Sequence, residues 1–416
     1  MTETIARAAW FHAEHLQRLL AALNAGKEEA RVVGGAIRNT LLDLPVKDID
    51  IATTRRPDDA GAVANDLSYK VVPTGIEHGT ITVVTPEAAY EVTTLREDIE
   101  TDGRHAVVSF GRDWQADAER RDFTVNALYA ASDGCIIDCV GGLPDIAARN
   151  IRFIGDPDQR IEEDALRILR FFRFHAHYGS GRPDAEGLRA CARHKSELGK
   201  LSTERVWSEL HRLFEAPDPR RTLLWMRQSS VLSTMLPESE KWGIDTIHTL
   251  VETEHTLGIE PDPMLRLMAI VPPSAERIDK LTNRLRLSNE DRDRLQNWVR
   301  AGTNDTGLPR LRELSYRINP QAVLDNLVLR HAKATDAKTV IDLARAYETI
   351  RAWNVPMLPV KGGELVELGI APGPEIGRLQ RDLEHWWIAS DFALERDELL
   401  SLAKNLLEDG PDRSGT

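Results

Sequence analysis

Two aspartates, Asp48 and Asp50, stand one residue apart in the short β-branched run KDIDI at residues 47–51. Side chains alternate along a strand, so a strand here places both carboxylates on one face and the isoleucines on the other. Carboxylates that close repel each other unless a cation lies between them, and such oxygen ligands suit Mg²⁺, which also takes phosphate oxygens. The pair predicts a metal site for phosphoryl chemistry, which would activate an attacking hydroxyl and neutralise a leaving pyrophosphate.

A glycine pair, Gly34 and Gly35, precedes the aspartates, between an expected strand at 31–33 and an expected helix. Paired glycines let the backbone approach a phosphate, whose charge the start of a helix stabilises. The Asp-x-Asp spacing also occurs at 156–158 and 291–293, so spacing alone is weak evidence. A tight turn beside a solvated acidic strand end explains these features about as well as metal–phosphate chemistry.

A third carboxylate, Glu91, lies inside the strand-like run AYEVT at residues 89–93. A half-buried carboxylate is costly unless it is paired or coordinated. Glu91 therefore favours a catalytic centre with Asp48 and Asp50. The alternative is a glutamate that faces outward from an edge strand.

Residues 119–128 place Arg121, Asp122 and Asn126 at the start of what we expect to be an apolar helix. Arginines there would hold a triphosphate through bidentate contacts, and Asp122 would accept a hydrogen bond from a ribose hydroxyl. The alternative is a helix cap with surface charges.

A second helical pattern covers residues 161–178, with Asp164 and Arg167 three residues apart. Such a pair is commonly an intrahelical ion pair of small energetic value. It also presents an acceptor beside a donor, which complements the exocyclic amine and ring nitrogen of cytosine and adenine. Guanine and uracil offer the reverse order and would leave polar groups unpaired. A single Asp–Arg pair would therefore accept CTP and ATP and reject GTP and UTP.

The elements that must position these residues form two regions. Expected strands at 31–33, 48–52, 80–84, 90–94 and 135–138 indicate an α/β or α+β unit with a mixed sheet. From about residue 160 helical patterns continue to the end of the chain. A chain of 416 residues exceeds one core and predicts two to four structural units.

Composition narrows the function classes. A hydrophobic content of 42% with 29% charged residues is typical of a globular protein, and no apolar run is long enough for a membrane span. The net charge of −13 argues against non-specific DNA binding but not against RNA, which depends on where the positive charge lies. The N-terminal 20 residues are expected to form an amphipathic helix and no targeting segment. Three sparse cysteines favour buried thiols in a reducing cytoplasm.

In these motifs the chain resembles the class II tRNA nucleotidyltransferases, the CCA-adding enzymes and their poly(A) polymerase relatives. The resemblance runs through 33–54, 90–129, 138–145 and 160–178, in the family's order. It implies a fold of class α+β, with a polymerase-β-like head (1–150) that carries a mixed sheet. An all-helical neck (151–218), body (219–345) and tRNA-binding tail (346–416) follow.

The resemblance also implies roles for individual residues. Asp48 and Asp50 match metal-binding aspartates, and Glu91 matches the third catalytic carboxylate. Residues 94–105 resemble a mobile loop that helps to switch from C to A addition, with Arg96, Asp102 and Arg104 in it. Nucleotide contacts are implied for Gly34, Gly35, Arg38, Arg121, Asp122, Asn126, Asp164, Arg167 and Arg170.

One residue departs from the family's pattern: Asn39 stands where the family usually has aspartate after the motif arginine. If that aspartate mainly braces the turn, asparagine replaces its hydrogen bonds. If it tunes the metal site, activity changes. We expect the bracing role.

The expected function is template-independent addition of CCA to tRNA 3′ ends from CTP and ATP with Mg²⁺, in the cytoplasm, with no membrane or DNA partner. A poly(A) polymerase, or an enzyme that adds only A or only C, shares nearly every motif. A fused phosphohydrolase with a His-Asp metal motif is disfavoured, because none of the 12 histidines is followed by aspartate. A non-catalytic RNA-binding protein on this fold is the third alternative.

Overall fold

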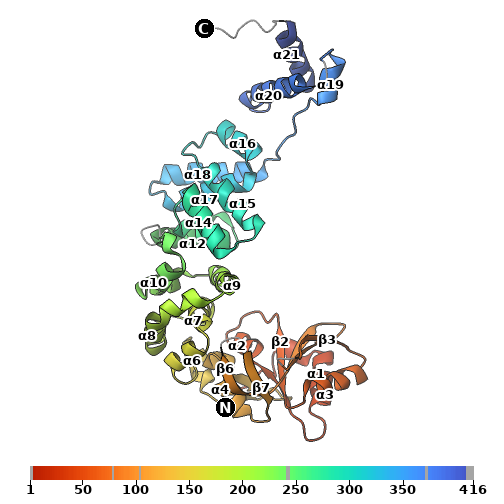
Figure 1. Ribbon diagram of the computed structural model, residues 1–416, viewed down its shortest axis with the longest axis vertical. Helices are drawn as coiled ribbons and strands as arrows, with labels where there is room; N and C mark the ends of the chain where they lie inside the picture. Colours follow the sequence, from red (N-terminus) through yellow and green to blue (C-terminus); the bar gives the residue numbers. More distant parts are fainter. Residues whose placement is uncertain (1–2, 77–78, 103–104, 240–243, 371–372, 409–416) are drawn as a thin grey trace. The chain divides into compact units, whose positions relative to one another are not determined.

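The computed structural model describes residues 3–76, 79–102, 105–239, 244–370 and 373–408 (Figure 1). The chain forms two compact units, Met1–Pro237 and Glu238–Thr416. The first contains a mixed sheet followed by helices, and the second contains only helices among its described residues, which confirms the expected α+β class. Among the described residues, no helix is long and apolar enough to cross a membrane.

The sheet of the first unit has seven strands in the order β3-β4-β5-β2-β1-β8-β9. Strands β2 and β5 are parallel and the other neighbours are antiparallel, so the sheet is mixed as predicted. The bounds are β1 Ala30–Val33, β2 Ile49–Thr53, β3 Lys70–Gly75, β4 Thr80–Val84, β5 Ala89–Thr94, β8 Leu128–Ala130 and β9 Ile136–Asp138.

Alternation along β2 and β5 separates a buried face from a polar one. Ile51 and Val92 are register partners and are buried, whereas Asp50 and Glu91, one position earlier, are partners on the other face. Asp48 directly precedes β2.

Helices α1 (Glu14–Leu23), α2 (Gly35–Leu41) and α3 (Pro57–Asp66) pack against the sheet. The expected N-terminal helix begins only at Glu14, after the short 3₁₀ turn η1 (Ala9–His12). Leucines on one side of α1 are fully buried, which is the amphipathic pattern that the sequence predicts.

The helix expected at 119–128 is wrong. Helix α4 (Trp114–Glu119) ends before the arginines, a 3₁₀ turn η3 covers Thr124–Asn126, and the apolar residues that follow form β8. All three residues of β8 are buried, between β1 and β9. Because a strand buried on both faces has a continuous apolar run, its pattern does not differ from that of a short buried helix.

The helix expected at 161–178 is two helices, α6 (Pro157–Glu163) and α7 (Leu166–Tyr178). Asp164 separates them, with an extended backbone (φ −153°, ψ 104°). Its carboxylate accepts a hydrogen bond from Leu166 N at 3.0 Å, which satisfies a free N–H at the start of α7. Asp164 therefore ends one helix and caps the next.

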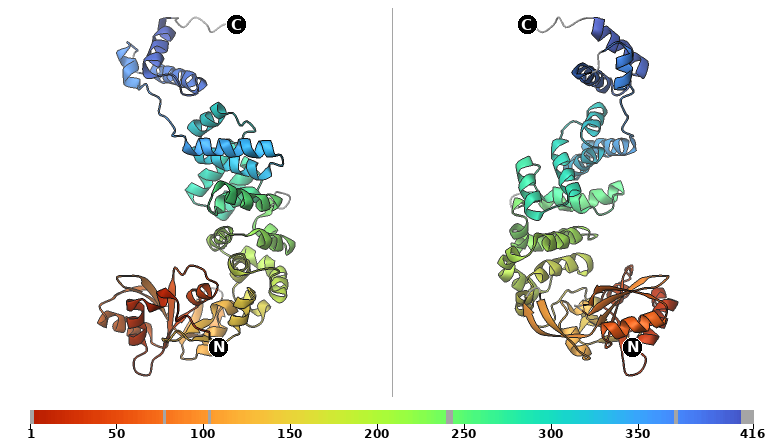
Figure 2. Two further views of the ribbon diagram at one scale, coloured as in Figure 1. Left: turned by 180° about the vertical axis from the view of Figure 1, so that it is seen from behind. Right: turned by 45° about the vertical axis from the view of Figure 1, so that its right-hand side comes forward.

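Further helices complete the first unit, and Figure 2 shows those after the sheet, in yellow to green, stacked on one another. A ring cluster of Phe123, Phe153 and Phe171 fixes α7 to the sheet-bearing part. The bounds are α5 Gly142–Ala147, α8 Ala185–His194, η4 Lys195–Lys200, α9 Thr203–Phe214, α10 Arg220–Gln228 and α11 Val231–Met235.

The segment expected as a mobile loop forms a two-stranded antiparallel hairpin, β6 (Arg96–Asp102) paired with β7 (His105–Phe110), with a register shift between Asp98 and Glu100. Arg96 and Asp102 therefore lie at the two ends of β6, and their expected part in the switch from C to A addition stays a prediction. Arg104 lies outside the described residues.

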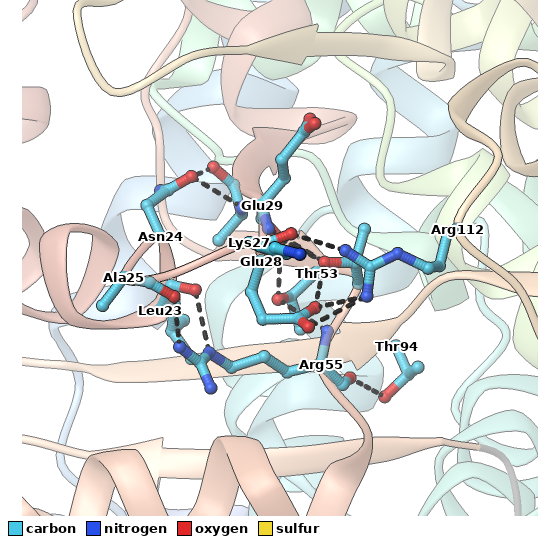
Figure 3. A network of polar contacts seen from close by, with 12 residues as sticks. Leu23, Asn24, Ala25, Lys27, Glu28, Glu29, Thr53, Arg55, Thr94 and Arg112 are labelled. Carbon is cyan, nitrogen blue, oxygen red and sulfur yellow. Dashed lines mark hydrogen bonds and ion pairs between the residues drawn. The ribbon is translucent and has the colours of Figure 1, made fainter.

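Both ends of this hairpin are tied to the sheet by a polar network (Figure 3). Before β6, the Thr94 hydroxyl donates to the carbonyl of Arg55 at 2.8 Å, and the Arg55 guanidinium donates to the carbonyls of Leu23 and Ala25 at the end of α1. After β7, Arg112 donates to the Glu28 carboxylate at 2.8 and 2.9 Å. The hairpin therefore has fixed ends.

The described part of the second unit consists of helices around buried leucines, with one buried ion pair and one half-buried ionic group. Arg266 is paired with Glu254 at 2.7 Å, and Arg294 with both Asp262 and Asp325. The boundary expected at residue 345 falls inside α18. The bounds are α12 Ile244–Leu257, α13 Pro263–Ile270, α14 Ala275–Leu285, α15 Asn289–Arg300, α16 Leu308–Arg317, α17 Pro320–Lys333, α18 Ala337–Ala352, α19 Gly362–Glu367, α20 Pro374–Ala389 and α21 Arg396–Glu408.

Candidate active site

A cleft of about 510 Å³ lies in the first unit, between the sheet and the helices that follow it. It gathers every residue that the family resemblance assigned to nucleotide binding, together with Asp50. Asp48 lies two residues before Asp50 in the sequence, and Glu91 is the register partner of Asp50 on β5. The lining residues are Gly34, Gly35, Arg38, Asp50, Arg121, Asp122, Asn126, Asp164, Leu166, Arg167, Arg170, Phe174 and Arg205.

The glycine turn lies where β1 passes into α2. Gly34 has φ +73°, a conformation that L side chains rarely adopt, and a Cβ there would lie 3.4 Å from the carbonyl oxygen of Asn126. The positive φ of the turn is therefore what favours glycine at position 34, since the contact with Asn126 would be an ordinary van der Waals contact. Gly35 has no such backbone constraint.

The carboxylates of Asp50 and Glu91 face the same side of the sheet, because the two residues are register partners on neighbouring parallel strands. Burial, and next the charge of Glu91, raise the pKa of Asp50 to about 6; Asp48 adds to the rise and Arg121 opposes it. Negative charge on this face of the sheet is therefore only partly compensated, and a cation would relieve it.

The donor set fits a divalent cation that also binds substrate. In the described part of the chain, no three His, Cys, Asp or Glu side chains are grouped closely enough to hold a metal ion by themselves. Mg²⁺ is commonly held by one or two carboxylates, with phosphate oxygens and water completing the octahedron. Asp48 and Asp50 have the carboxylate chemistry that such a site requires.

Arg121 is held from behind by two residues that sequence reasoning missed, Asp117 and Tyr129. The Asp117 carboxylate is 1% exposed and accepts from Arg121 at 3.1 Å and from the Tyr129 hydroxyl at 2.7 Å. Burial alone would raise the pKa of Asp117, but Arg121 and Arg120 outweigh burial and lower it. The buried carboxylate therefore stays charged and fixes Arg121 at the cleft. The four-residue spacing to Arg121 was the only available signal.

A chain of polar contacts connects the glycine turn to α7. The Arg38 guanidinium donates to the side-chain oxygen of Asn126, and the Asn126 amide donates to Asp122 at 3.1 Å. Asp122 also accepts from Arg170 Nε at 2.8 Å. Burial alone would raise the pKa of Asp122, but Arg170 and Asn126 lower it. Asp122 and Arg170, expected as separate ribose and phosphate contacts, are thus each other's partner in the cleft.

Asn39, the departure from the family's pattern, makes the hydrogen bonds that the expected bracing role requires. Its side-chain oxygen accepts from Arg38 at 2.8 and 3.2 Å, and its amide donates to the carbonyl of Pro45 at 2.8 Å. Asn39 therefore connects a cleft arginine to the loop that leads to Asp48.

Asp164 and Arg167 both line the cleft, but they do not pair with each other as an intrahelical ion pair would. Asp164 accepts from Arg205 of α9 at 2.7 Å. Arg167 donates to the Glu163 carboxylate and to the carbonyl of Arg160 at 2.7 Å. The break at Asp164 causes this difference, because the aspartate no longer follows the ridge of α7. Arg205 was missed, and a lone arginine at the start of a helix gives no signal of a partner 41 residues away.

The arrangement combines three chemical properties in one cavity. Carboxylates on one face of the sheet can hold a cation. The guanidinium groups of Arg38, Arg121 and Arg170 can neutralise phosphates, and Asp164 beside Arg167 can recognise a base edge. These are the properties that binding of a nucleoside triphosphate requires.

Models of two known families match the first unit. The poly A polymerase head domain matches residues 30–152, and the probable RNA and SrmB-binding site of polymerase A matches residues 183–242. The first match covers the sheet and the Arg121–Asn126 turn; the second covers α9 with Arg205.

Relatives match nearly the whole chain. The mitochondrial CCA tRNA nucleotidyltransferase 1 of Mus musculus is 32% identical over 401 residues, which is 94% of this chain and 90% of the relative. The CCA-adding enzyme of Streptococcus uberis is 32% identical over 383 residues, 88% of this chain and 91% of the relative.

Solved structures share the fold. The Bacillus stearothermophilus CCA-adding enzyme in complex with CTP has a TM-score of 0.71 at 24% identity and covers 95% of this chain and 98% of its own. The Thermotoga maritima CCA-adding enzyme complexed with tRNA_CCA has a TM-score of 0.67 at 19% identity and covers 98% and 99%. The chain belongs to the family of CCA-adding tRNA nucleotidyltransferases and related poly(A) polymerases.

Proposed function

We propose that this protein adds C, C and A to the 3′ end of tRNA without a nucleic-acid template, using CTP and ATP with Mg²⁺ and releasing pyrophosphate. The single observation that carries the proposal is that one cleft contains Asp50, the Asp122–Arg170 pair, and Asp164 together with Arg167. Relatives named CCA-adding enzyme or CCA tRNA nucleotidyltransferase, at 30–32% identity over most of the chain, support it.

In the proposed reaction, the 3′ oxygen of the tRNA forms a bond to the α-phosphorus of the bound nucleotide. The bond from that phosphorus to the α–β bridging oxygen breaks, and pyrophosphate leaves with the electron pair. The proton of the 3′ hydroxyl passes to solvent. Arg121, held by Asp117 and Tyr129, lies at the cleft to neutralise phosphate charge as it develops.

Asp48 and Asp50 would hold Mg²⁺, with Glu91 beside them on β5. When bound, the ion lowers the pKa of the attacking hydroxyl and neutralises the phosphates. The chain itself contributes the pairing of β2 with β5, which places Asp50 beside Glu91 on one face of the sheet, with Asp48 directly before β2.

Base selection is proposed for Asp164 and Arg167. Asp164 accepts a hydrogen bond from the exocyclic amine of C or A, and Arg167 donates to the adjacent ring nitrogen. To bind a base, Arg167 shares or exchanges its contact with Glu163. Guanine and uracil place a carbonyl against Asp164 and would leave both groups poorly paired.

The decisive experiment measures incorporation of each NTP separately into tRNA that ends before CCA, after CC and after CCA. The proposal expects C on the first substrate, A on the second and nothing on the third. Addition of A to all three substrates would instead identify a poly(A) polymerase. Addition of A to the second substrate, with no C on the first, would identify an A-adding enzyme, and addition of C to the first, with no A on the second, a C-adding one.

The non-catalytic alternative is tested with Asp48→Ala. Loss of incorporation with retained tRNA binding supports an enzyme, whereas an unchanged biological role would support a binding protein. The fourfold division into head, neck, body and tail, with tRNA contacts in the tail, stays part of this proposal. The cytoplasmic localisation is also part of this proposal, and the three free cysteines favour it. Microscopy of the tagged chain in cells tests this localisation.

A further inference from the structure

A second cavity, of about 320 Å³, adjoins the nucleotide cleft within the first unit. Arg38 and Phe174 line both cavities and form their common wall. The remaining walls come from the last turns of α7 and α9: Arg173, His177, Tyr178, Arg212 and Glu215. The volume is about ten times the roughly 30 Å³ that one water occupies in the liquid, so the cavity accommodates a small, hydrated anion.

Positive charge exceeds negative charge around this cavity. Arg173 is 12% exposed and is ion-paired with Glu209 at 3.1 Å. Burial lowers the pKa of Arg173 further than Glu209 raises it, and Arg170 and Arg212 lower it as well. Within the described residues the Arg212 guanidinium has neither an ion pair nor a hydrogen bond, and Glu215 is the only acidic residue in the lining.

Guanidinium groups continue from the cleft into this cavity around the Phe174 ring. The centre of that ring lies 5.3 Å from the guanidinium carbon of Arg38, 5.4 Å from that of Arg170 and 4.7 Å from that of Arg173. Arg38 also stacks on Tyr178 at 3.8 Å. Guanidinium groups therefore line both cavities, around the ring that forms part of their common wall.

We infer that the second cavity binds the pyrophosphate product on its way out of the nucleotide cleft, with Arg212 as its outermost contact. The inference rests on the proposed function, because it requires a reaction that releases pyrophosphate. Guanidinium groups bind phosphates through bidentate hydrogen bonds, and a dianionic or more highly charged product gains most from several of them.

The position of the cavity argues against the tRNA 3′ end as its occupant. In phosphoryl transfer the attacking and leaving oxygens lie roughly in line on opposite sides of the phosphorus. Asp50, one of the carboxylates proposed to hold the ion that activates the attacking hydroxyl, lines the nucleotide cleft but not the second cavity, which adjoins the cleft at Arg38 and Phe174. The cavity is therefore on the leaving-group side.

The test is product inhibition by inorganic pyrophosphate at fixed free Mg²⁺, with the full-length chain, tRNA ending in CC and ATP. Arg212→Ala is compared with Arg212→Lys, which keeps the charge, and with Arg189→Ala, which removes an exposed arginine of α8 away from both cavities. The inhibition constant for pyrophosphate is expected to rise about fivefold to tenfold in Arg212→Ala, less in Arg212→Lys and not in Arg189→Ala, as loss of one charge-assisted contact implies. Pyrophosphorolysis of tRNA ending in CCA is expected to need correspondingly more pyrophosphate.

Three results would overturn the inference. An unchanged inhibition constant in Arg212→Ala excludes a product site. A parallel rise in KM for ATP assigns Arg212 to the bound triphosphate, and a rise in KM for tRNA alone assigns the cavity to RNA phosphates. If the reference protein incorporates no nucleotide in the forward assay, the proposed function itself fails, which is a separate outcome.

Discussion

Asp164 and Arg205 are joined by a hydrogen bond of 2.7 Å across 41 residues of sequence, and both line the nucleotide cleft. The bond fixes one oxygen of the carboxylate, while the other accepts from Leu166 N. Asp164 is thereby held in one orientation from two helices. A base-selecting carboxylate needs such support, because a freely rotating carboxylate could not reject the wrong base edge.

We expect Arg205→Ala to reduce selectivity for CTP and ATP over GTP and UTP by about fivefold to tenfold, since a hydrogen bond to a charged partner is worth about 1.5–3 kcal/mol when buried and less at this partly exposed site. The measurement is kcat/KM for the four nucleotides. Asp164→Ala is expected to relax base choice more strongly. Unchanged selectivity in both variants would remove Asp164 from base recognition.

Asp50→Asn is expected to reduce incorporation of both C and A by at least about 100-fold, because it removes a carboxylate that Mg²⁺ requires. The fold should not suffer, since burial and Glu91 oppose ionisation of Asp50. Thermal unfolding checks this point: the Tm of the variant should equal or exceed that of the parent. A variant with parental activity would show that the metal lies elsewhere.

Asn39→Ala should raise KM for CTP about threefold to tenfold, because Arg38 loses its acceptor and Pro45 its donor. Asn39→Asp restores the family's usual residue and keeps the acceptor for Arg38. Its KM for CTP should therefore lie between that of the parent and that of Asn39→Ala. Steady-state kinetics with titrated Mg²⁺ distinguish the two roles considered for this position. A changed Mg²⁺ requirement, with KM for CTP unaffected, would favour metal tuning over bracing.

Arg112→Ala should impair A addition to tRNA ending in CC more than C addition, by about threefold or more. Two observations lead to this prediction. Arg112, which follows β7, is hydrogen-bonded to Glu28, and the hairpin region resembles a loop that helps to switch specificity from C to A. The ion pair is partly exposed, so the Tm should fall little. Glu28→Gln should reproduce the effect, and equal losses for C and A would contradict it.

His175 should contribute to the pH dependence of the free energy of unfolding. It is buried in α7, and its Nδ1 atom lies 2.8 Å from the Thr222 hydroxyl oxygen. Burial lowers its pKa from 6.5 to about 4. Between these pH values the unfolded chain takes up a proton that the folded chain does not. The contribution of His175 is therefore complete above pH 6.5 and is lost as the pH falls towards 4, at up to about 1.4 kcal/mol per pH unit.

Urea unfolding at pH 7, 6 and 5 compares the parent with His175→Gln, whose side chain does not titrate. The variant should lose less stability between pH 7 and pH 5 than the parent does. The same loss in both proteins would mean that His175 is already protonated in the fold, or exposed.

The sequence by itself determined the elements whose pattern is local. Alternation placed Asp50 opposite the buried face of β2, the glycine pair marked the turn before α2, and β-branched runs identified the central strands. Each of these depends on neighbours one or two residues away, so no tertiary information is needed. The family resemblance added the remaining cleft residues, all of which the fold brings to one cavity.

Only the tertiary structure decided which partners hold those residues. Residues 128–130 form a strand because their backbone pairs with β1 and β9 on either side, although their apolar run suits a helix equally well. Asp164 leaves the helix because capping α7 and pairing with Arg205 satisfy both carboxylate oxygens. Asp117 and Tyr129 support Arg121 from different elements. No helical or strand periodicity relates the residues that these contacts join. Buried charged groups need hydrogen-bond partners, and the fold can supply those partners from any part of the chain.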